Sequence, residues 1–180
     1  MGKLIIFLGP SGSGKSTMAA QCGLPELVTY TTRKPRQGEI NGVTYHFIPV
    51  WRARLMRLFD LWAEYIFVFG NYYGTTKKQI EDVEMETQNF CAVLDKNGVS
   101  HYRKHMRDKP LVIGLRINME TAERRLRQRH IDNPDIFKHR LMEIQRELNE
   151  MTECDIIIDN PDGQWETTLA TVKEFIAKNV

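Results

Sequence analysis

The chain has 180 residues and a formal net charge of +2; 42% of its residues are hydrophobic and 27% are charged. That length suits one compact globular domain with its own core, and so small a net charge gives no argument for nucleic-acid binding. No apolar run approaches the roughly 20 residues that a membrane-spanning helix needs, so we expect a cytoplasmic protein without a nucleic-acid or membrane partner.

The chain begins with an apolar run over residues 3–8, which predicts a buried strand. No small-residue cleavage site follows it, so a signal peptide is not indicated. The next residues fit the pattern G-x-x-x-x-G-K-[ST] and lead into a helical segment. This phosphate loop comprises Gly9, Pro10, Ser11, Gly12, Ser13, Gly14, Lys15, Ser16 and Thr17.

Such a loop is typical of a nucleoside triphosphate site. Its glycines let successive backbone N–H groups point inward at an anion, and the N-terminus of the following helix adds a positive dipole end. Lys15 would contact the β- and γ-phosphates, and the Ser16 hydroxyl would ligate Mg²⁺. The motif predicts ATP with Mg²⁺ but does not identify the acceptor.

Residues 28–76 differ from the flanking chain. Residues 43–48 alternate apolar and polar side chains, aromatic residues gather at 65–73, and Gly or Pro separates the runs. We predict a small β-rich insertion here, closed by a helix near 76–88. Tyr65, Phe67 and Phe69 alternate, so we place them on one face of a strand.

Chemistry for an acceptor follows within this insertion. Arg33 and Arg36 are three residues apart, with a proline between them, and can present two guanidinium groups to one phosphate. Tyr45 could donate to the same group. Glu64 could accept from the adjacent N1 and N2 hydrogens of guanine, which adenine lacks, and a hydroxyl could donate to O6.

Further apolar runs predict core strands over 91–94, 110–117 and 154–158. Helices are predicted over 120–129, 138–151 and 165–178, with residues 130–134 as a loop. The second helix would place Leu141, Ile144, Leu148 and Met151 on one face, and the third Leu169, Val172 and Ile176. Strands that alternate with helices are typical of a parallel α/β sheet.

Two sets of residues receive structural interpretations. The cysteines Cys22, Cys91 and Cys154 are far apart and lack C-x-x-C spacing, so we expect reduced, mostly buried thiols. His101 and His105 are four residues apart and could form a metal pair. Because no third ligand is evident, we favour a solvated helix for them.

Taken together, the motifs resemble the guanylate kinase family, which has T-T-R-x-P-R-x-G-E, G-x-x-Y-x-F and G-N-Y-Y-G-[ST] at similar separations. The resemblance covers nearly the whole chain. It implies a P-loop NTPase sheet with flanking helices, a small β-rich GMP-binding insertion and a short lid. One domain over 1–180 would divide into a core (1–27, 89–123 and 141–180), an insertion (28–88) and a lid (124–140).

The resemblance also assigns residues. The GMP phosphate would be held by Arg33, Arg36, Tyr45 and Tyr73. Guanine would be recognised by Thr29, Glu64 and Thr75, with Asp95 beside the acceptor nucleotide. Catalytic charge would come from Lys15, Arg33 and, when the lid closes, Arg129 and Arg140. Asn160 would lie near the adenine of ATP.

The chain departs from the family pattern at several positions. About fifteen residues separate Ser16 from Thr31, so the first helix must be unusually short. Asn97 stands where a second aspartate is usual, which affects the outer shell of the metal, and His130 replaces the glycine that normally follows the lid arginine. Thr29 and Thr75 replace the commoner serines but keep the hydroxyl.

The predicted activity is therefore ATP-dependent phosphorylation of GMP, and of dGMP, by a monomer or homodimer. Two alternatives share part of the pattern. A related ribose 1,5-bisphosphate phosphokinase should lack the full T-R-x-P-R-x-G-E motif together with Glu64. A guanylate-kinase-like binding module, which recognises peptides, typically lacks an intact phosphate loop.

Overall fold

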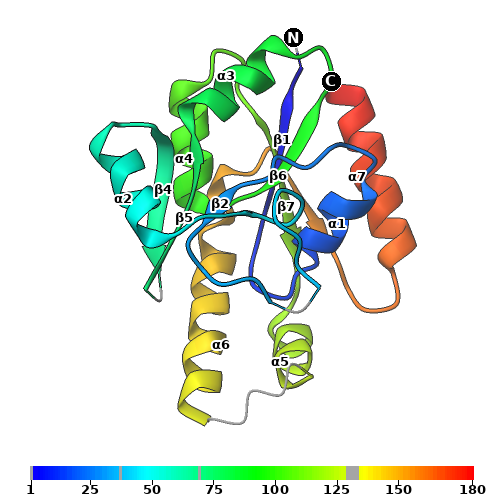
Figure 1. Cartoon of the computed structure of the whole chain (residues 1–180). Helices are drawn as coiled ribbons and strands as arrows, with labels where there is room; N and C mark the ends of the chain where they lie inside the picture. The colour runs from blue at the N-terminus through cyan, green and yellow to red at the C-terminus, as the bar shows by residue number, and fades with distance from the viewer. Residues whose placement is uncertain (1, 37, 69, 129–133) are drawn as a thin grey trace.

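The computed structural model of the chain describes residues 2–36, 38–68, 70–128 and 134–180 (Figure 1). The predictions for Arg129, His130 and Phe69 lie outside these residues. In chain order the elements are β1 (Leu4–Leu8), α1 (Lys15–Gln21), β2 (Tyr30–Thr31), β3 (His46–Phe47), α2 (Val50–Leu58), β4 (Trp62–Val68), β5 (Asn71–Thr76), α3 (Lys77–Met85), β6 (Phe90–Val93), α4 (Lys96–His105), β7 (Leu111–Arg116), α5 (Met119–Arg127), α6 (Pro134–Asn149), η1 (Met151–Glu153), β8 (Ile156–Asp159) and α7 (Trp165–Asn179).

The core is a parallel four-stranded sheet in the order β6-β1-β7-β8. These are the four strands predicted from apolar runs, with bounds that differ by at most two residues. The side chains of β1 are at most 6% exposed, because both faces of the sheet are covered by helices. A parallel sheet covered in this way is typical of α/β proteins and confirms the predicted fold class.

The two faces of the sheet bury alternate residues of each strand. Ile5 and Phe7 pack with Met18 of α1 and Val172 of α7. Leu4, Ile6 and Leu8 instead face α3 and α4. Figure 1 shows α1 and α7 on one side of the sheet and α3 and α4 on the other. The result is a three-layer core in which α1, directly after the phosphate loop, is only seven residues long, as expected.

The C-terminal helices confirm the predicted periodicity with one correction. In α7, Val172 and Ile176 are buried. Helix α6 begins at Pro134, earlier than predicted, and ends at Asn149. Met151 therefore does not lie on that helix but in η1, where it is still buried. The backbone N–H of Glu150 donates to both Arg146 O and Glu147 O, which tightens the last turn and ends the α-helix.

The insertion holds a second sheet in the order β3-β2-β5-β4, which confirms that this segment is rich in strands. Helix α3 closes it, with Thr76 and Gln79 forming a capping box. The alternation at 43–48 yields only the two-residue β3, because Gly42 lies in a turn with φ 79° and the backbone is extended only from His46.

Helix α2 was not predicted. Its apolar residues fall on two opposite faces, so no single stripe with helical spacing marks it in the sequence. Ala53 and Met56 are buried, and the Trp62 indole N–H donates to Ala53 O. Trp51 and Leu58 are 64% and 75% exposed on the outer face.

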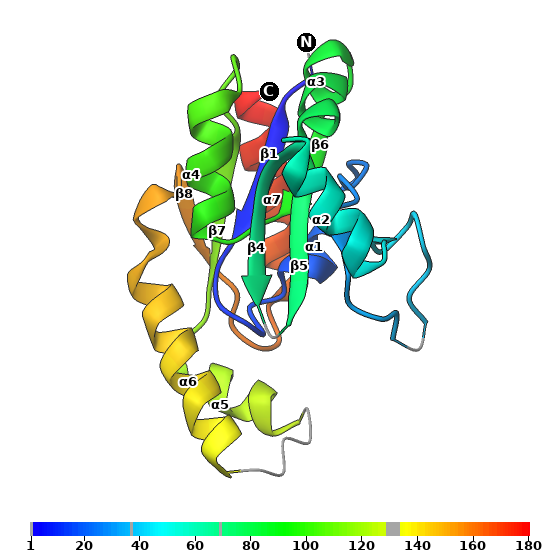
Figure 2. The same cartoon turned by 60° about the vertical axis from the view of Figure 1, so that its left-hand side comes forward.

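Helices α5 and α6 form an arm that projects from the core (Figure 2). Ile117, Ala122, Leu126 and Ile144 are buried between them. The predicted lid falls on this arm, and α6 runs without interruption through residues 140 and 141. Among the residues described, no helix is both long and apolar enough to cross a bilayer.

Two of the three thiols are buried side by side, and all three cysteines are unpaired, as predicted. Cys22 at the end of α1 and Cys91 on β6 are 7% and 0% exposed. Both sulfur atoms face the carbonyl oxygen of Ala19, at 3.3 and 3.6 Å. The thiols therefore lie between the helix that follows the phosphate loop and the edge of the sheet.

Gly74 holds the register that places Glu64 opposite Thr75 in the insertion sheet. A Cβ atom at position 74 would lie 2.3 Å from Glu64 O and 2.9 Å from Tyr65 Cα, both backbone atoms. We expect Gly74→Ala to push β4 from β5 and to lower the free energy of unfolding by about 1–3 kcal/mol. Urea denaturation measures this change, and an unaltered midpoint would show that the strands separate without cost.

Candidate functional site

The phosphate loop joins β1 to α1 in a conformation that glycine makes accessible. Gly9, Gly12 and Gly14 have φ values of 143°, 84° and 94°, which side chains disfavour. The Lys15 ammonium group donates to Gly9 O and Pro10 O at 2.7 and 2.8 Å, across the loop. The loop therefore has the curled shape that the sequence predicts.

A pocket of about 460 Å³ lies beside this loop and will be called the loop pocket. Its lining residues are Ser11, Gly12, Gly14, Lys15, Ser16, Thr17, Arg125, Asn160 and Trp165. Asn160 is buried, and its amide donates to Ser13 O at 2.9 Å. This contact brings the loop after β8 against the phosphate loop, so Asn160 lines the loop pocket. Its predicted place near the adenine of ATP stays a prediction.

Arg125 and Trp165 line the same pocket and were missed from the sequence. The Arg125 guanidinium donates to Gly12 O at 2.8 Å and to Asn160 O at 3.2 Å, and it pairs with Asp162. It therefore connects α5 to both loops of the pocket. In the sequence it is one of several arginines of a basic run, and only its contacts distinguish it.

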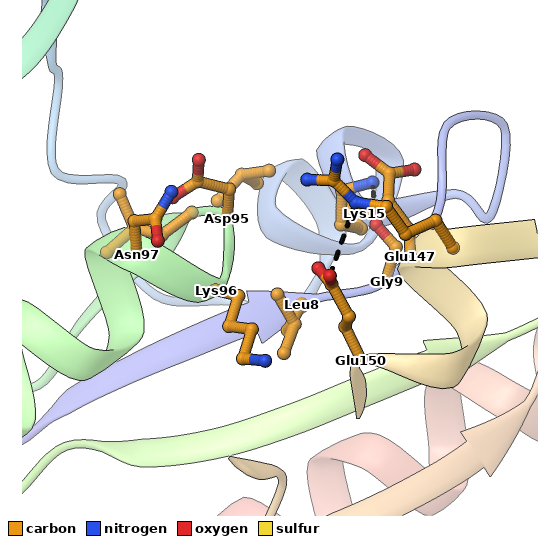
Figure 3. Close-up of a pocket in the computed structure, with 11 residues that line it drawn as sticks. Leu8, Gly9, Lys15, Asp95, Lys96, Asn97, Glu147 and Glu150 are labelled. Atoms are coloured by element: carbon orange, nitrogen blue, oxygen red, sulfur yellow. Dashed lines mark hydrogen bonds and ion pairs between the residues drawn. The ribbon is translucent and has the colours of Figure 1, made fainter. Parts of the chain in front are cut away.

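A second cavity, the central pocket of about 390 Å³, lies between the phosphate loop and the N-terminus of α4 (Figure 3). Lys15, Asp95 and Asn97 contribute to its wall, together with Glu147 of α6 and Glu150, which follows that helix. Arg146 also lines it and pairs with Glu150 at 3.2 Å. Asn97, which departs from the family pattern, thus lines the same cavity as Lys15.

Glu147 on α6 contacts the phosphate loop. Its Oε2 accepts from the backbone N–H of Ser11 at 3.0 Å. Burial raises the pKa of this carboxyl, while the Ser11 amide and the Lys15 charge act in the opposite direction. This hydrogen bond connects α6 to the phosphate loop.

A third cavity, the insertion pocket of about 240 Å³, brings together residues predicted to bind the acceptor. Thr29, Tyr45, Glu64, Tyr73 and Asp95 all line it, from five separate segments of the chain. Asp95 also lines the central pocket. The two cavities therefore meet at Asp95, which is the geometry that direct transfer between two bound substrates requires.

Glu64 is a partly buried carboxyl group in the wall of this pocket. Its Oε1 accepts from the Thr75 hydroxyl at 2.9 Å. Burial raises the pKa of Glu64 to about 7, assisted by the nearby Asp95 charge and opposed by the Thr75 hydrogen bond. The Thr75 proton is thus directed to the carboxylate rather than into open space.

Arg33 lies near both tyrosines of the insertion pocket. Its guanidinium carbon is 5.6 Å from the centre of the Tyr45 ring, and the rings of Tyr45 and Tyr73 are 6.2 Å apart. Glu39 accepts from both Arg33 terminal nitrogens, at 2.7 and 3.0 Å, and from the Arg36 backbone N–H at 2.6 Å. Arg33 holds the pKa of Glu39 below its usual range. Glu39 therefore orients Arg33, a role suggested in the sequence only by its place in the motif.

The remaining predicted residues are not brought into these pockets. The Arg36 side chain is exposed. Arg140 lies on α6, 3.5 Å from Glu143, and does not line the loop or central pocket. His101 and His105 have rings stacked at 4.0 Å on α4, and the described parts of the chain contain no group of three or more potential metal ligands.

Comparison with known proteins identifies relatives over nearly the whole chain. A family model described as guanylate kinase matches residues 1–179. The guanylate kinase of Aromatoleum aromaticum is 36% identical over 170 residues, which cover 91% of this chain and 82% of that protein. That of Rickettsia felis is 31% identical over 180 residues, covering 97% and 93%.

Solved structures agree on the fold. The crystal structure of guanylate kinase from Anaplasma phagocytophilum superimposes with a TM-score of 0.74 at 22% identity, covering 99% of this chain and 87% of that one. Shikimate kinase from Acinetobacter baumannii matches with a TM-score of 0.51 at 13% identity, covering 99% and 95%. At these identities the structural similarity supports the fold alone.

Asp95 caps helix α4 and also carries a negative charge, and two substitutions can separate these roles. Its Oδ1 accepts from the Gly98 backbone N–H at 2.8 Å and caps α4. We expect Asp95→Ala to lower stability by about 1 kcal/mol, the usual value of such a cap. Asp95→Asn should keep most of the cap while removing the charge. Urea denaturation of both variants tests this, and equal losses would exclude the capping role.

Proposed function

Because the chain belongs to the guanylate kinase family, we infer that it transfers the γ-phosphoryl group of ATP to GMP, forming ADP and GDP. The observation that carries this assignment is the insertion pocket, which holds a carboxylate, hydroxyl groups and two tyrosines. It shares Val93, Leu94 and Asp95 with the central pocket beside Lys15. One substrate on each side of Asp95 would place the acceptor phosphate next to the donor.

Guanine would bind against Glu64. In its charged form this carboxylate accepts from both N1–H and the N2 amino group, whereas adenine offers neither donor in that arrangement. A buried carboxylate left without donors is costly, so the site would discriminate strongly against AMP. Thr75 already donates to Oε1 and supports the carboxylate, and Thr29 lines the same pocket as a hydroxyl for O6.

The GMP phosphate would bind between Arg33, Arg36, Tyr45 and Tyr73. Arg33 is already oriented by Glu39 and half-buried, so little side-chain freedom is lost when a phosphate binds. Arg36 is exposed and must swing inward. The phosphate oxygen that attacks ATP is anionic at neutral pH, so the reaction needs no general base.

ATP would bind along the loop pocket, with its phosphates on the N–H groups of residues 9–17. Lys15 would exchange its contacts with Gly9 O and Pro10 O for the β- and γ-phosphates. Asn160 borders this pocket on the side where we place adenine. These residues contribute mainly electrostatic stabilisation and alignment, which phosphoryl transfer requires more than covalent help.

We propose Mg²⁺ as the divalent ion that accompanies ATP. Ser16 is the first candidate ligand, because its exposed side chain lines the loop pocket next to Lys15. Mg²⁺ commonly takes one or two protein oxygens and completes its shell with phosphates and water, so this donor set suits it. When bound, the ion neutralises charge on the phosphate oxygens.

The arm of α5 and α6 would act as the lid. Closure would bring Arg140, and Arg129 from the segment outside the described residues, to the transferring phosphoryl group. Closure would also exclude water and so prevent hydrolysis of ATP. The domain boundaries given above, the use of dGMP, the monomeric or homodimeric state and the cytoplasmic location stay predictions from the sequence.

A substrate panel tests the function directly. ADP release should be rapid with GMP and dGMP, and slow with AMP, CMP, UMP and ribose 1,5-bisphosphate. Lys15→Ala should lower turnover by about 10²-fold or more, because a charge aimed at the transition state is lost. Lys109→Ala is a matched control at an exposed position. Preference for ribose 1,5-bisphosphate, or turnover unaffected by Lys15→Ala, would contradict the assignment.

Glu64 gives GMP use a distinctive pH dependence. Its pKa is raised to about 7, so the carboxyl is charged above that pH and neutral below it. We expect kcat/KM for GMP to rise as pH increases through about 7, because only the charged form accepts both guanine hydrogens. Folding stability changes with pH in the opposite direction. The stabilising contribution of Glu64 is present below the pKa of the unfolded chain and is lost as pH rises through about 7.

Glu64→Gln should remove this part of the pH dependence and lower kcat/KM for GMP roughly 10²–10⁴-fold, as expected for two charge-assisted bonds. The GMP phosphate titrates identically with both proteins, so their difference isolates Glu64. The kcat/KM for IMP, which lacks the N2 amino group, should fall less than that for GMP. If the variant used GMP as well as the parent does, base recognition would have to lie elsewhere.

A further inference from the structure

Tyr102 on α4 has the largest side chain among the fully buried residues, with 0% exposure. Its ring points from α4 into the core that this helix and α3 form with the sheet, and Val99 and Met106 belong to the same cluster. A phenylalanine would fill this apolar position equally well. The hydroxyl is the feature that packing does not explain, because a buried O–H requires a partner.

That partner belongs to the insertion pocket. The Tyr102 hydroxyl donates to Thr75 Oγ1 at 2.7 Å, and Thr75 is itself fully buried. Thr75 Oγ1 donates in turn to Glu64 Oε1 at 2.9 Å. The three side chains come from α4, β5 and β4, and α4 packs directly against β4 (Figure 2). A relay of two hydrogen bonds therefore runs from the core to the carboxylate that faces the pocket.

The direction of this relay follows from the donors available. A threonine hydroxyl has one proton, and it rotates to suit its partners. Because Tyr102 donates to Thr75, the oxygen of Thr75 is occupied as an acceptor and its proton points at Glu64. Burial raises the pKa of Tyr102 well above its ordinary value, so the phenol stays a donor at every pH at which the protein would act.

We propose that Tyr102 is a positioning residue for recognition of the guanine base. By fixing the rotation of the Thr75 hydroxyl, it holds the Glu64 carboxylate in one orientation, in which it would accept from both N1–H and the N2 amino group of the base. Tyr102 does not line the insertion pocket and acts only through Thr75 and Glu64. The inference rests on the proposed function, since it concerns the same pocket and the same substrate.

Removal of the hydroxyl tests this role. Tyr102→Phe keeps the ring but leaves Thr75 free to rotate away from Glu64. We expect KM for GMP to rise roughly 3- to 10-fold, the effect of one neutral hydrogen bond, with KM for ATP unchanged. The ratio of kcat/KM for GMP to that for IMP should also fall. GMP donates two hydrogen bonds to the Glu64 carboxylate and IMP only one, so a less firmly held carboxylate weakens GMP binding more. Tyr72→Phe is the matched control, because it removes a hydroxyl on β5 from a residue that does not line the insertion pocket. It should change neither KM for GMP nor the preference for GMP over IMP.

A double-mutant cycle separates positioning from packing. Thr75→Val removes the middle of the relay, so Tyr102→Phe should cause little further loss of GMP use in that background. Additive losses, or parallel changes in KM for ATP and in thermal stability, would overturn the proposal, as would an unaltered KM for GMP in Tyr102→Phe. A parent that does not phosphorylate GMP overturns the proposed function and this inference with it. An active parent with an unaffected variant overturns this inference alone.

Discussion

Burial of β1 on both faces is the constraint on which the site depends. Its five side chains are enclosed between two layers of helices, and it pairs in parallel with β6 and β7. Parallel strands end at one edge of the sheet, so the chain after β1 and the chain after β6 meet there. Those two segments are the phosphate loop and Asp95. The positions of Lys15 and Asp95 around one cavity therefore follow from the way the core is packed.

The charged side chains of the site contact groups of the protein itself. Lys15 contacts carbonyl oxygens of its loop, Arg33 is paired with Glu39, and Glu147 takes the Ser11 N–H. Under the proposed function, each substrate would therefore exchange one set of polar contacts for another. A partly buried charge that is paired in this way costs less free energy than an unpaired buried ion.

The sequence predicts those parts whose determinants are local. Buried strands are continuous apolar runs, and the phosphate loop is a contiguous motif, so both appear where expected. Helix α2 is different, because the core contact of Ala53 and Met56 is obscured by the apolar residues on its opposite face. Arg125 and Tyr102 were missed for another reason. Their partners, Gly12 and Thr75, are distant in the chain, and no spacing rule connects them.

The adjacent buried thiols of Cys22 and Cys91 allow the opening of α1 to be followed by chemical labelling. Both are too deeply buried for an alkylating reagent to reach while α1 lies on β6. Labelling must therefore wait for the helix to detach, and its rate reports the free energy of that local opening. Because α1 starts at the phosphate loop, any ligand held by the loop should slow the modification without touching either sulfur atom.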